Sequence, residues 1–185
     1  MKTKKILWGV ISLKYKIIFK KFGKLSYIMK PLGIIINGGK VVFGDYIRVQ
    51  PGLRMELLDK SSTITIGENV SIGQNVHITS GGTLSIGKNT TILGNTFITN
   101  IDHEYQDIGV PVLNQKNNIT TTEIGENSFI GYGSAIQAGT RLGKQCVVGA
   151  NSVVRGVFDD YSVIVGSPGK VVKKYNTNTK KWEKV

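Results

Sequence analysis

Cysteine and histidine are scarce in this 185-residue chain, which holds one cysteine and two histidines. The single cysteine, Cys146, excludes an internal disulfide and suits a reducing compartment such as the cytoplasm. The two histidines, His77 and His103, are too few for a three-histidine zinc site, so we expect no metal. Disulfide-stabilised and zinc-dependent classes of protein are therefore not expected.

Long apolar runs are also missing, since none approaches the roughly 20 residues needed to cross a bilayer. The charged start and the apolar stretch from Ile6 to Leu13 imitate the first two regions of a secretory signal peptide. That stretch nevertheless runs directly into Lys14, Tyr15 and Lys16, and no small-residue cleavage site follows. We expect a protein that is neither secreted nor membrane-spanning.

Acidic residues are few, with 12 against 24 basic residues and a net charge of +12. None precedes Asp45, whereas lysines crowd that segment. Its apolar residues recur at helical spacing, which predicts a basic amphipathic segment over residues 1–35. The residues at that spacing are Leu7, Ile11, Ile18, Phe22 and Leu25.

The most informative pattern is a repeat of six residues. Residues 64–72 return twenty positions later as residues 84–92, and residues 124–136 return eighteen positions later as residues 142–154. Glycine usually follows the apolar anchor of each unit, and a small residue stands four positions after it. The anchors are Ile66, Ile72, Ile78, Ile86, Ile92, Ile98, Ile124, Ile130, Ile136, Leu142, Val148 and Val154.

Three such units make one coil, and coils stack at about 4.8 Å. The repeat therefore predicts an all-β fold, a parallel β-helix over residues 36–165, with 166–185 as a C-terminal segment. An antiparallel sandwich would show no constant six-residue phase. Asn69, Asn89, Asn127 and Asn151 suit turns that need positive φ. The small residues expected beside the anchors are Val70, Val76, Thr96, Ser128, Ser134, Thr140, Cys146 and Ser152.

The six-residue phase weakens before this pattern and breaks once within it. Ile36, Val42 and the segment from Ile47 to Val49 suggest one or two irregular coils before Ile64. The phase also breaks between Asn100 and Glu123, where no anchor ladder is found. We expect an excursion loop at about residues 100–123, and long loops on regular scaffolds tend to be functional.

The motif Asn100-Ile-Asp-His103 stands at the start of this loop, and further coils follow the loop. This arrangement makes the chain similar to a known family. It resembles the hexapeptide-repeat acyltransferases, in the galactoside, maltose and nodulation-factor O-acetyltransferase branch, and within it the enzymes of bacterial surface polysaccharides. The resemblance covers about residues 60 to 175. It implies a left-handed coil, a homotrimer and acetyl-CoA as co-substrate. Periodicity alone implies none of these, since parallel crossovers are normally right-handed.

The resemblance assigns the reacting residues by position. His103 follows the anchors with the spacing of the family's catalytic histidine and is the expected general base. A neutral imidazole near pH 7 can take the proton of an attacking hydroxyl. Asp102 would fix its tautomer, or would be a turn residue bonding its own backbone. Asn100 is the expected contact for the acceptor.

The resemblance also assigns the donor site. The backbone around Gly131, Tyr132 and Gly133 matches the place where the family supplies a donor to the oxyanion. Phe129 stands where relatives carry an aromatic near the acyl group, and Ala150 matches a backbone contact to pantetheine. The segment from Val165 to Lys173 is similar to the family's C-terminal motif, in which basic residues meet the phosphates of CoA. Lys170 and Lys173 take that role.

Two reactive side chains are left out of the site. Cys146 occupies the small position of a repeat, where it should pack inside, so direct transfer through a ternary complex is expected. His77 lies between anchors of a regular coil and is expected to be a solvent-facing strand residue.

The basic N-terminal segment admits two interpretations that are compatible. Residues 1–30 could contact an anionic membrane peripherally, at the cytoplasmic face of the inner membrane. They could instead cap the open end of the β-helix. Nucleic acid is not an expected partner, because the basic residues show no interleaved aromatic pattern and no binding module. The last lysines, Lys180, Lys181 and Lys184, are expected in a solvated tail.

The predicted function is O-acetylation of a sugar hydroxyl in O-antigen, capsule or exopolysaccharide biosynthesis. N-acetylation of a nucleotide-linked amino sugar, with the same fold and donor, is the alternative, and a non-catalytic β-helix that serves structure or binding is a third. Gly73 and Gly81 stand where the galactoside enzymes hold their sugar with polar residues. Their substrate is therefore not transferred to this chain.

Overall fold

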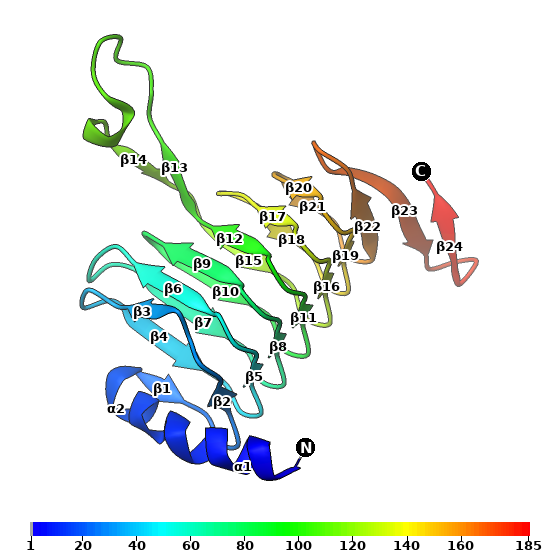
Figure 1. Cartoon of the computed structure of the whole chain (residues 1–185). Coiled ribbons are helices and arrows are strands. Elements are labelled where there is room, and N and C mark those ends of the chain that lie inside the picture. The colour runs from blue at the N-terminus through cyan, green and yellow to red at the C-terminus, as the bar shows by residue number, and fades with distance from the viewer. Residues whose placement is uncertain (1) are drawn as a thin grey trace.

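The chain winds into a left-handed parallel β-helix with three faces (Figure 1). The computed structural model describes residues 2–185, with side chains from Ile6 onward. Each coil gives one short strand to each of three sheets, and strands of successive coils pair in parallel. The sequence prediction of an all-β hexapeptide solenoid is confirmed.

The first face, sheet A, has seven strands. In sheet order they are β1 (Lys21–Phe22), β4 (Lys40–Phe43), β7 (Thr63–Ile66), β10 (Thr83–Ile86), β15 (Thr122–Ile124), β18 (Arg141–Leu142) and β21 (Val157–Phe158).

The second face, sheet B, has nine strands, and its last two pairings, β22 with β23 and β23 with β24, are antiparallel. They are β2 (Tyr27–Ile28), β5 (Arg48–Val49), β8 (Ser71–Ile72), β11 (Thr91–Ile92), β16 (Phe129–Ile130), β19 (Val147–Val148), β22 (Ser162–Val165), β23 (Lys170–Asn176) and β24 (Lys181–Lys184). Sheet C has six: β3 (Gly33–Ile35), β6 (Arg54–Leu57), β9 (His77–Ser80), β12 (Phe97–Thr99), β17 (Ala135–Ile136) and β20 (Val153–Val154).

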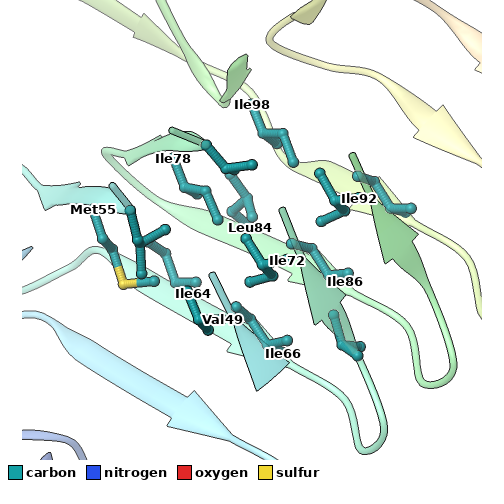
Figure 2. Packing of buried hydrophobic residues seen from close by; sticks show 14 of the residues in the cluster. Val49, Met55, Ile64, Ile66, Ile72, Ile78, Leu84, Ile86, Ile92 and Ile98 are labelled. Atoms are coloured by element: carbon teal, nitrogen blue, oxygen red, sulfur yellow. The ribbon is translucent and has the colours of Figure 1, made fainter. Parts of the chain in front are cut away.

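The core consists of three ladders of apolar side chains, one behind each sheet (Figure 2). In sheet A, Ile66 lies beside Ile86, which in turn lies beside Ile124. All twelve predicted anchors are buried, as are the eight small residues predicted beside them. Burying one such isoleucine contributes roughly 1.5–3 kcal/mol, so the ladder is the main source of stability.

Turns between the sheets need residues that tolerate unusual backbone positions. Asn69, Asn89, Asn127 and Asn151 have φ between 54° and 59°, as predicted. Glycine after an anchor allows close stacking of coils, because a Cβ on Gly87 would lie 2.4 Å from the backbone nitrogen of Glu126. Asparagine and glycine therefore recur every six residues because the turns between the sheets require them.

The regular coils begin earlier than the boundary expected at residue 36. Strand β1 pairs with β4 and strand β2 pairs with β5, both in parallel. The early inward residues are Phe43, Val49 and Met55, while Val42 points outward and is half-buried. Alternation along β4 puts Val41 and Phe43 inside, so the position predicted at Val42 was one residue out of register.

A helical segment covers the first coil. It consists of α1 (Lys2–Ile11), the 3-10 helix η1 (Ser12–Lys14) and α2 (Tyr15–Ile18). Tyr15 and Phe19 are buried against Phe22 and Phe43 at the end of the apolar core. Within residues 2–185, no helix is long and apolar enough to cross a membrane.

The excursion begins after β12 and ends before β15, close to the predicted bounds. It is not a plain loop: β13 (Ile101–His103) pairs antiparallel with β14 (Asn117–Ile119), and η2 (Val112–Asn114) lies between them. The hairpin projects away from the β-helix (Figure 1). The C-terminal lysines Lys180, Lys181 and Lys184 are exposed to solvent, as expected, but Lys181 and Lys184 belong to β24, which pairs with β23.

Candidate active site

His103 is the last residue of β13, at the base of the projecting hairpin. It lies opposite Asn117 of β14, and its side chain is exposed. Among the described residues, its ring makes no hydrogen bond. The hairpin therefore presents an imidazole that is accessible to an acceptor.

Asp102 is held by a cation from another coil and not by the imidazole. Its Oδ1 accepts a hydrogen bond from the backbone nitrogen of His103 at 3.1 Å, and its Oδ2 lies 2.8 Å from Nη2 of Arg155. Arg155 follows β20, which is separated from β12 by β17 in sheet C. Sequence reasoning missed Arg155; its one signal is a basic residue directly after the anchor Val154, where glycine is usual.

Asn100 is completely buried at the start of the excursion. Its Oδ1 accepts a hydrogen bond from the backbone nitrogen of Gly81 at 2.8 Å, and its Nδ2 donates one to Oγ of Ser80 at 3.2 Å. Its carbonyl accepts from the backbone nitrogen of Thr120 at 3.0 Å. These contacts fix both ends of the hairpin to the previous coil, and they leave Asn100 no exposed surface with which to touch an acceptor in one chain.

Gly81 and Gly82 receive the other strand of the hairpin. A Cβ on Gly81 would lie 2.5 Å from Cδ1 of Ile119, and a Cβ on Gly82 would lie 2.8 Å from its Cγ2. The two glycines thus make room for Ile119, and Gly81 is one of the two positions, with Gly73, at which the sequence departs from the galactoside enzymes. The departure at Gly81 therefore has a structural cause, the packing of Ile119.

The expected donor-site residues gather at the corner between sheets B and C. The turn from Gly131 to Gly133 stacks on the turn around Ala150, since a Cβ on Gly131 would lie 2.6 Å from the backbone nitrogen of Ala150. The amides of Gly131 and Gly133 donate to the carbonyls of Val148 and Gly94, at 2.9 and 3.0 Å. Among the described residues, the amides of Tyr132 and Ala150 have no acceptor, so both are free to donate a hydrogen bond at this corner.

Lys170 and Lys173 lie on the same side of the molecule. Both are exposed on β23, which is antiparallel to β22, with Lys170 opposite Val165 and Lys173 opposite Val163. The turn that precedes Lys170 lies over the same corner, because Gly166 accepts from the backbone nitrogen of Val153 at 3.0 Å. Phe129 is 42% exposed on the outer side of sheet B. The corner thus has cations, an aromatic ring and free amides.

One chain does not bring this corner to His103. The donor-site residues lie where the strands of sheet C begin, and His103 lies beyond the point where they end. Residues 95–100 cross this face and span about 16 Å at roughly 3.3 Å per residue. His103 is three residues farther along the chain. Within one chain, His103 and the expected donor-site residues therefore stay apart.

The two remaining reactive side chains have other environments. Cys146 is fully buried, and this burial raises the pKa of its thiol. His77 lies half-buried on the outer side of β9, with Nε2 at 3.4 Å from Oε2 of Glu56 and its ring beside Phe97. The prediction of a solvent-facing strand residue is confirmed for His77.

Comparisons with known proteins identify the family of this fold. The model of the bacterial transferase hexapeptide (six repeats) matches residues 121–156, and that of the hexapeptide repeat of succinyl-transferase matches residues 63–100. The Escherichia coli K12 protein WbbJ, named as a lipopolysaccharide biosynthesis O-acetyl transferase, is 36% identical over 157 residues. The match covers 81% of this chain and 80% of WbbJ.

Two solved structures share the fold. A variant of AntD, an N-acyltransferase from Bacillus cereus in complex with dTDP and coenzyme A, has a TM-score of 0.73 and 22% identity over 90% of both chains. Galactoside acetyltransferase in complex with coenzyme A has a TM-score of 0.64 and 26% identity, over 77% of this chain and 71% of that chain. The chain belongs to the hexapeptide-repeat acyltransferases, and it is a transferase by family.

Proposed function

We propose that this chain is an acetyl-CoA-dependent O-acetyltransferase that acts on a sugar hydroxyl in bacterial surface polysaccharide biosynthesis. The observation that carries the proposal is the position of His103. It is an exposed histidine at the base of the hairpin that interrupts the repeat. The similarity to WbbJ supports the class of acceptor.

The reaction on this proposal is a direct transfer. Nε2 or Nδ1 of neutral His103 accepts the proton of the sugar hydroxyl as its oxygen attacks the thioester carbonyl carbon. The carbon–sulfur bond then breaks, and the imidazolium returns the proton to the departing thiolate of CoA. The amide of Tyr132 donates to the oxyanion of the tetrahedral intermediate.

The donor site on this proposal is the corner between sheets B and C. Lys170 and Lys173 bind phosphate groups of CoA as point charges. Phe129 lies near the acyl group, and Ala150 meets the pantetheine through its backbone. The match to galactoside acetyltransferase in complex with coenzyme A supports this placement, and so does the exposed, cationic character of the corner.

The proposal includes a cytoplasmic homotrimer with sites between subunits. The separation of His103 from the donor corner supports it, because a neighbouring subunit that presents its corner to His103 would complete the site. A closed ring of identical subunits repeats that contact at each interface. Each subunit would then supply His103 to one site and the donor corner to another.

N-acetylation of a nucleotide-linked amino sugar is the competing function. The likeness to AntD extends over 90% of both chains, but at 22% identity it concerns the fold. An amine acceptor differs from a hydroxyl in needing less help from a base, since a neutral amine is already nucleophilic. The choice of acceptor in the assay therefore separates the two functions.

The test is the release of free CoA from acetyl-CoA with a panel of sugars, nucleotide-linked amino sugars and lipid-linked glycans. We expect release with a hydroxyl acceptor, and a decrease of about 10²–10⁴-fold in His103→Gln. His77→Gln is the matched control, which should retain activity because His77 lies outside the proposed site. Equal rates in the parent and His103→Gln would remove His103 from catalysis, and release with amino sugars alone would establish the N-acetyltransferase.

A further inference from the structure

The end of the β-helix that carries the helical segment presents an apolar surface to solvent. Ile17 is 90% exposed, Ile6 is 67% exposed and Val10 is 61% exposed. Such large exposed apolar side chains usually occur singly, whereas here they are contiguous along one segment. We name this surface the N-terminal face and define it by Ile6, Leu7, Val10, Leu13, Ile17, Ile18 and Leu25.

Capping of the β-helix does not account for this face. The residues that cover the first coil are Ser12, Tyr15 and Phe19, all of which are buried. Ser12 accepts a hydrogen bond from the backbone nitrogen of Ile28 at 2.9 Å, and the ring of Phe19 lies 5.0 Å from that of Phe43. The N-terminal face consists of other side chains of this segment, together with Leu25 of the turn after β1, and none of them is buried against the first coil. The face therefore needs a partner of its own.

A cavity opens beneath this face. It has a volume of about 490 Å³ and lies between α1 and the turn that follows β1. Ile6, Val10, Leu13 and Leu25 line it together with Tyr27 and Tyr46, and Lys16 and Lys24 also contribute to its wall. An apolar hollow with cations beside it accepts hydrocarbon next to a negative charge.

Exposed lysines surround the face, and the nearby carboxylate of Asp45 accepts a hydrogen bond from the backbone nitrogen of Lys24 at 2.8 Å without forming a salt bridge to a described lysine. Residues 1–30 contain nine lysines and no acidic residue. Lys14, Lys16, Lys20, Lys21 and Lys24 are all exposed, and within the part of the chain that has described side chains no salt bridge reaches any of them. Apolar residues flanked by lysines without salt bridges fit a surface that has both negative charge and exposed hydrocarbon.

We propose that the N-terminal face docks on the surface of an anionic phospholipid bilayer. The segment of α1, η1 and α2 lies along the membrane plane, with Ile6, Val10 and Ile17 at the boundary between headgroups and acyl chains. The lysines meet the phosphate groups of the lipids. The charge complementarity selects a bilayer over a neutral apolar partner, because each lysine that reaches an anionic surface strengthens binding about fivefold.

The first experiment is flotation of the full-length protein with vesicles at physiological salt. Vesicles of phosphatidylglycerol and phosphatidylcholine in equal parts should carry the protein, and vesicles of phosphatidylcholine alone should not. The triple variant Lys16→Gln, Lys20→Gln, Lys24→Gln should bind about a hundredfold more weakly, since three lysines are lost. The matched control is Lys180→Gln, Lys181→Gln, Lys184→Gln, which removes the same charge from the opposite end and should bind like the parent.

A second pair of variants tests the apolar contribution. Ile17→Gln should weaken flotation, whereas Val157→Gln, at a residue that is 76% exposed on β21, should leave it unchanged. Both positions are on the surface, and circular dichroism verifies that the variants fold. Failure of the parent to float with anionic vesicles overturns the proposal, as does equal loss in the two triple variants or equal binding to phosphatidylcholine. None of these results depends on catalysis.

Discussion

Cys146 occupies an inward position in the column of small residues behind sheet B. Its neighbours in that column are Ser128 and Ser162, both buried. Its Sγ lies 3.3 Å from the carbonyl oxygen of Asp159, which is an acceptor that a serine hydroxyl could also use. Because burial raises the pKa of the Cys146 thiol, the reactive thiolate is scarce near neutral pH.

Cys146→Ser should therefore retain acetyl transfer and fold normally. The hydroxyl keeps the hydrogen bond to Asp159, so the change in the free energy of unfolding should be about 1 kcal/mol or less. The parent should resist a thiol reagent until it is denatured. Assays of CoA release and of thiol modification check both statements, and loss of activity in Cys146→Ser would instead indicate an acyl-cysteine intermediate.

Single residues of the site differ in how far sequence could predict them. His103 stands out because the six-residue phase breaks around it. The ion pair between Asp102 and Arg155 could not be predicted, since the two residues belong to different coils and meet only when the coils stack. The burial of Asn100 likewise follows from its contacts with Ser80 and Gly81, which only the packed hairpin creates.

At the scale of elements, a ladder of asparagines joins the turns between sheets A and B. Asn69 donates through Nδ2 to Oδ1 of Asn89 at 2.9 Å, and Asn89 donates to Oδ1 of Asn127 at 3.1 Å. Asn89 also has φ of 58°, in the left-handed region. It thus contributes both a backbone conformation and two hydrogen bonds.

Replacing Asn89 separates these two contributions. Asn89→Gly keeps the backbone conformation and loses the exposed side-chain bonds, so it should cost less than about 1 kcal/mol. Asn89→Ala loses the same bonds but keeps a Cβ in the left-handed region, so it should be about 1–2 kcal/mol less stable than Asn89→Gly. Denaturant unfolding of the two variants measures both terms, and equal stability of glycine and alanine would contradict the role of φ.

The strands were predictable to the extent that their side chains alternate between core and solvent. The anchors from Ile66 to Val154 repeat because each coil buries the same positions. The hairpin of β13 and β14 carries no such signal, since Asn117 to Ile119 are all exposed. Strand β24 is exposed throughout as well, and it pairs with β23 through main-chain hydrogen bonds, a contact between the rings of Tyr175 and Trp182, and a hydrogen bond from Asn176 to Glu183. None of these contacts has a periodic signal in the sequence.

At the scale of the whole molecule, the two ends of the β-helix are covered by different elements. The helical segment closes the first coil with Tyr15 and Phe19, and β23 covers the edge of β22 at the other end. Closed ends suit a solenoid, whose exposed edges would otherwise pair with other chains. Among the described residues, no further sheet covers the outer face of sheet C, which lies between His103 and the donor corner.

The assembly that would complete the site can be tested by mixing two inactive variants. His103→Gln lacks the base, and Lys170→Glu combined with Lys173→Glu repels the phosphates of CoA. If each site takes His103 from one subunit and the donor corner from its neighbour, some sites of a mixed trimer are intact. Random mixing of equal amounts makes such sites about one quarter of the total, because each of the two contributions is intact half the time.

Co-refolded mixtures should therefore regain about one quarter of the parent rate of CoA release, at acetyl-CoA concentrations where each variant alone is inactive. The same variants mixed without refolding are the control, since their subunits do not exchange. Light scattering of the refolded sample measures the mass of the assembly. If the protein is a monomer, or if the mixture is no more active than either variant alone, one chain must bring the donor to His103 by itself. That would require the hairpin to fold back along sheet C.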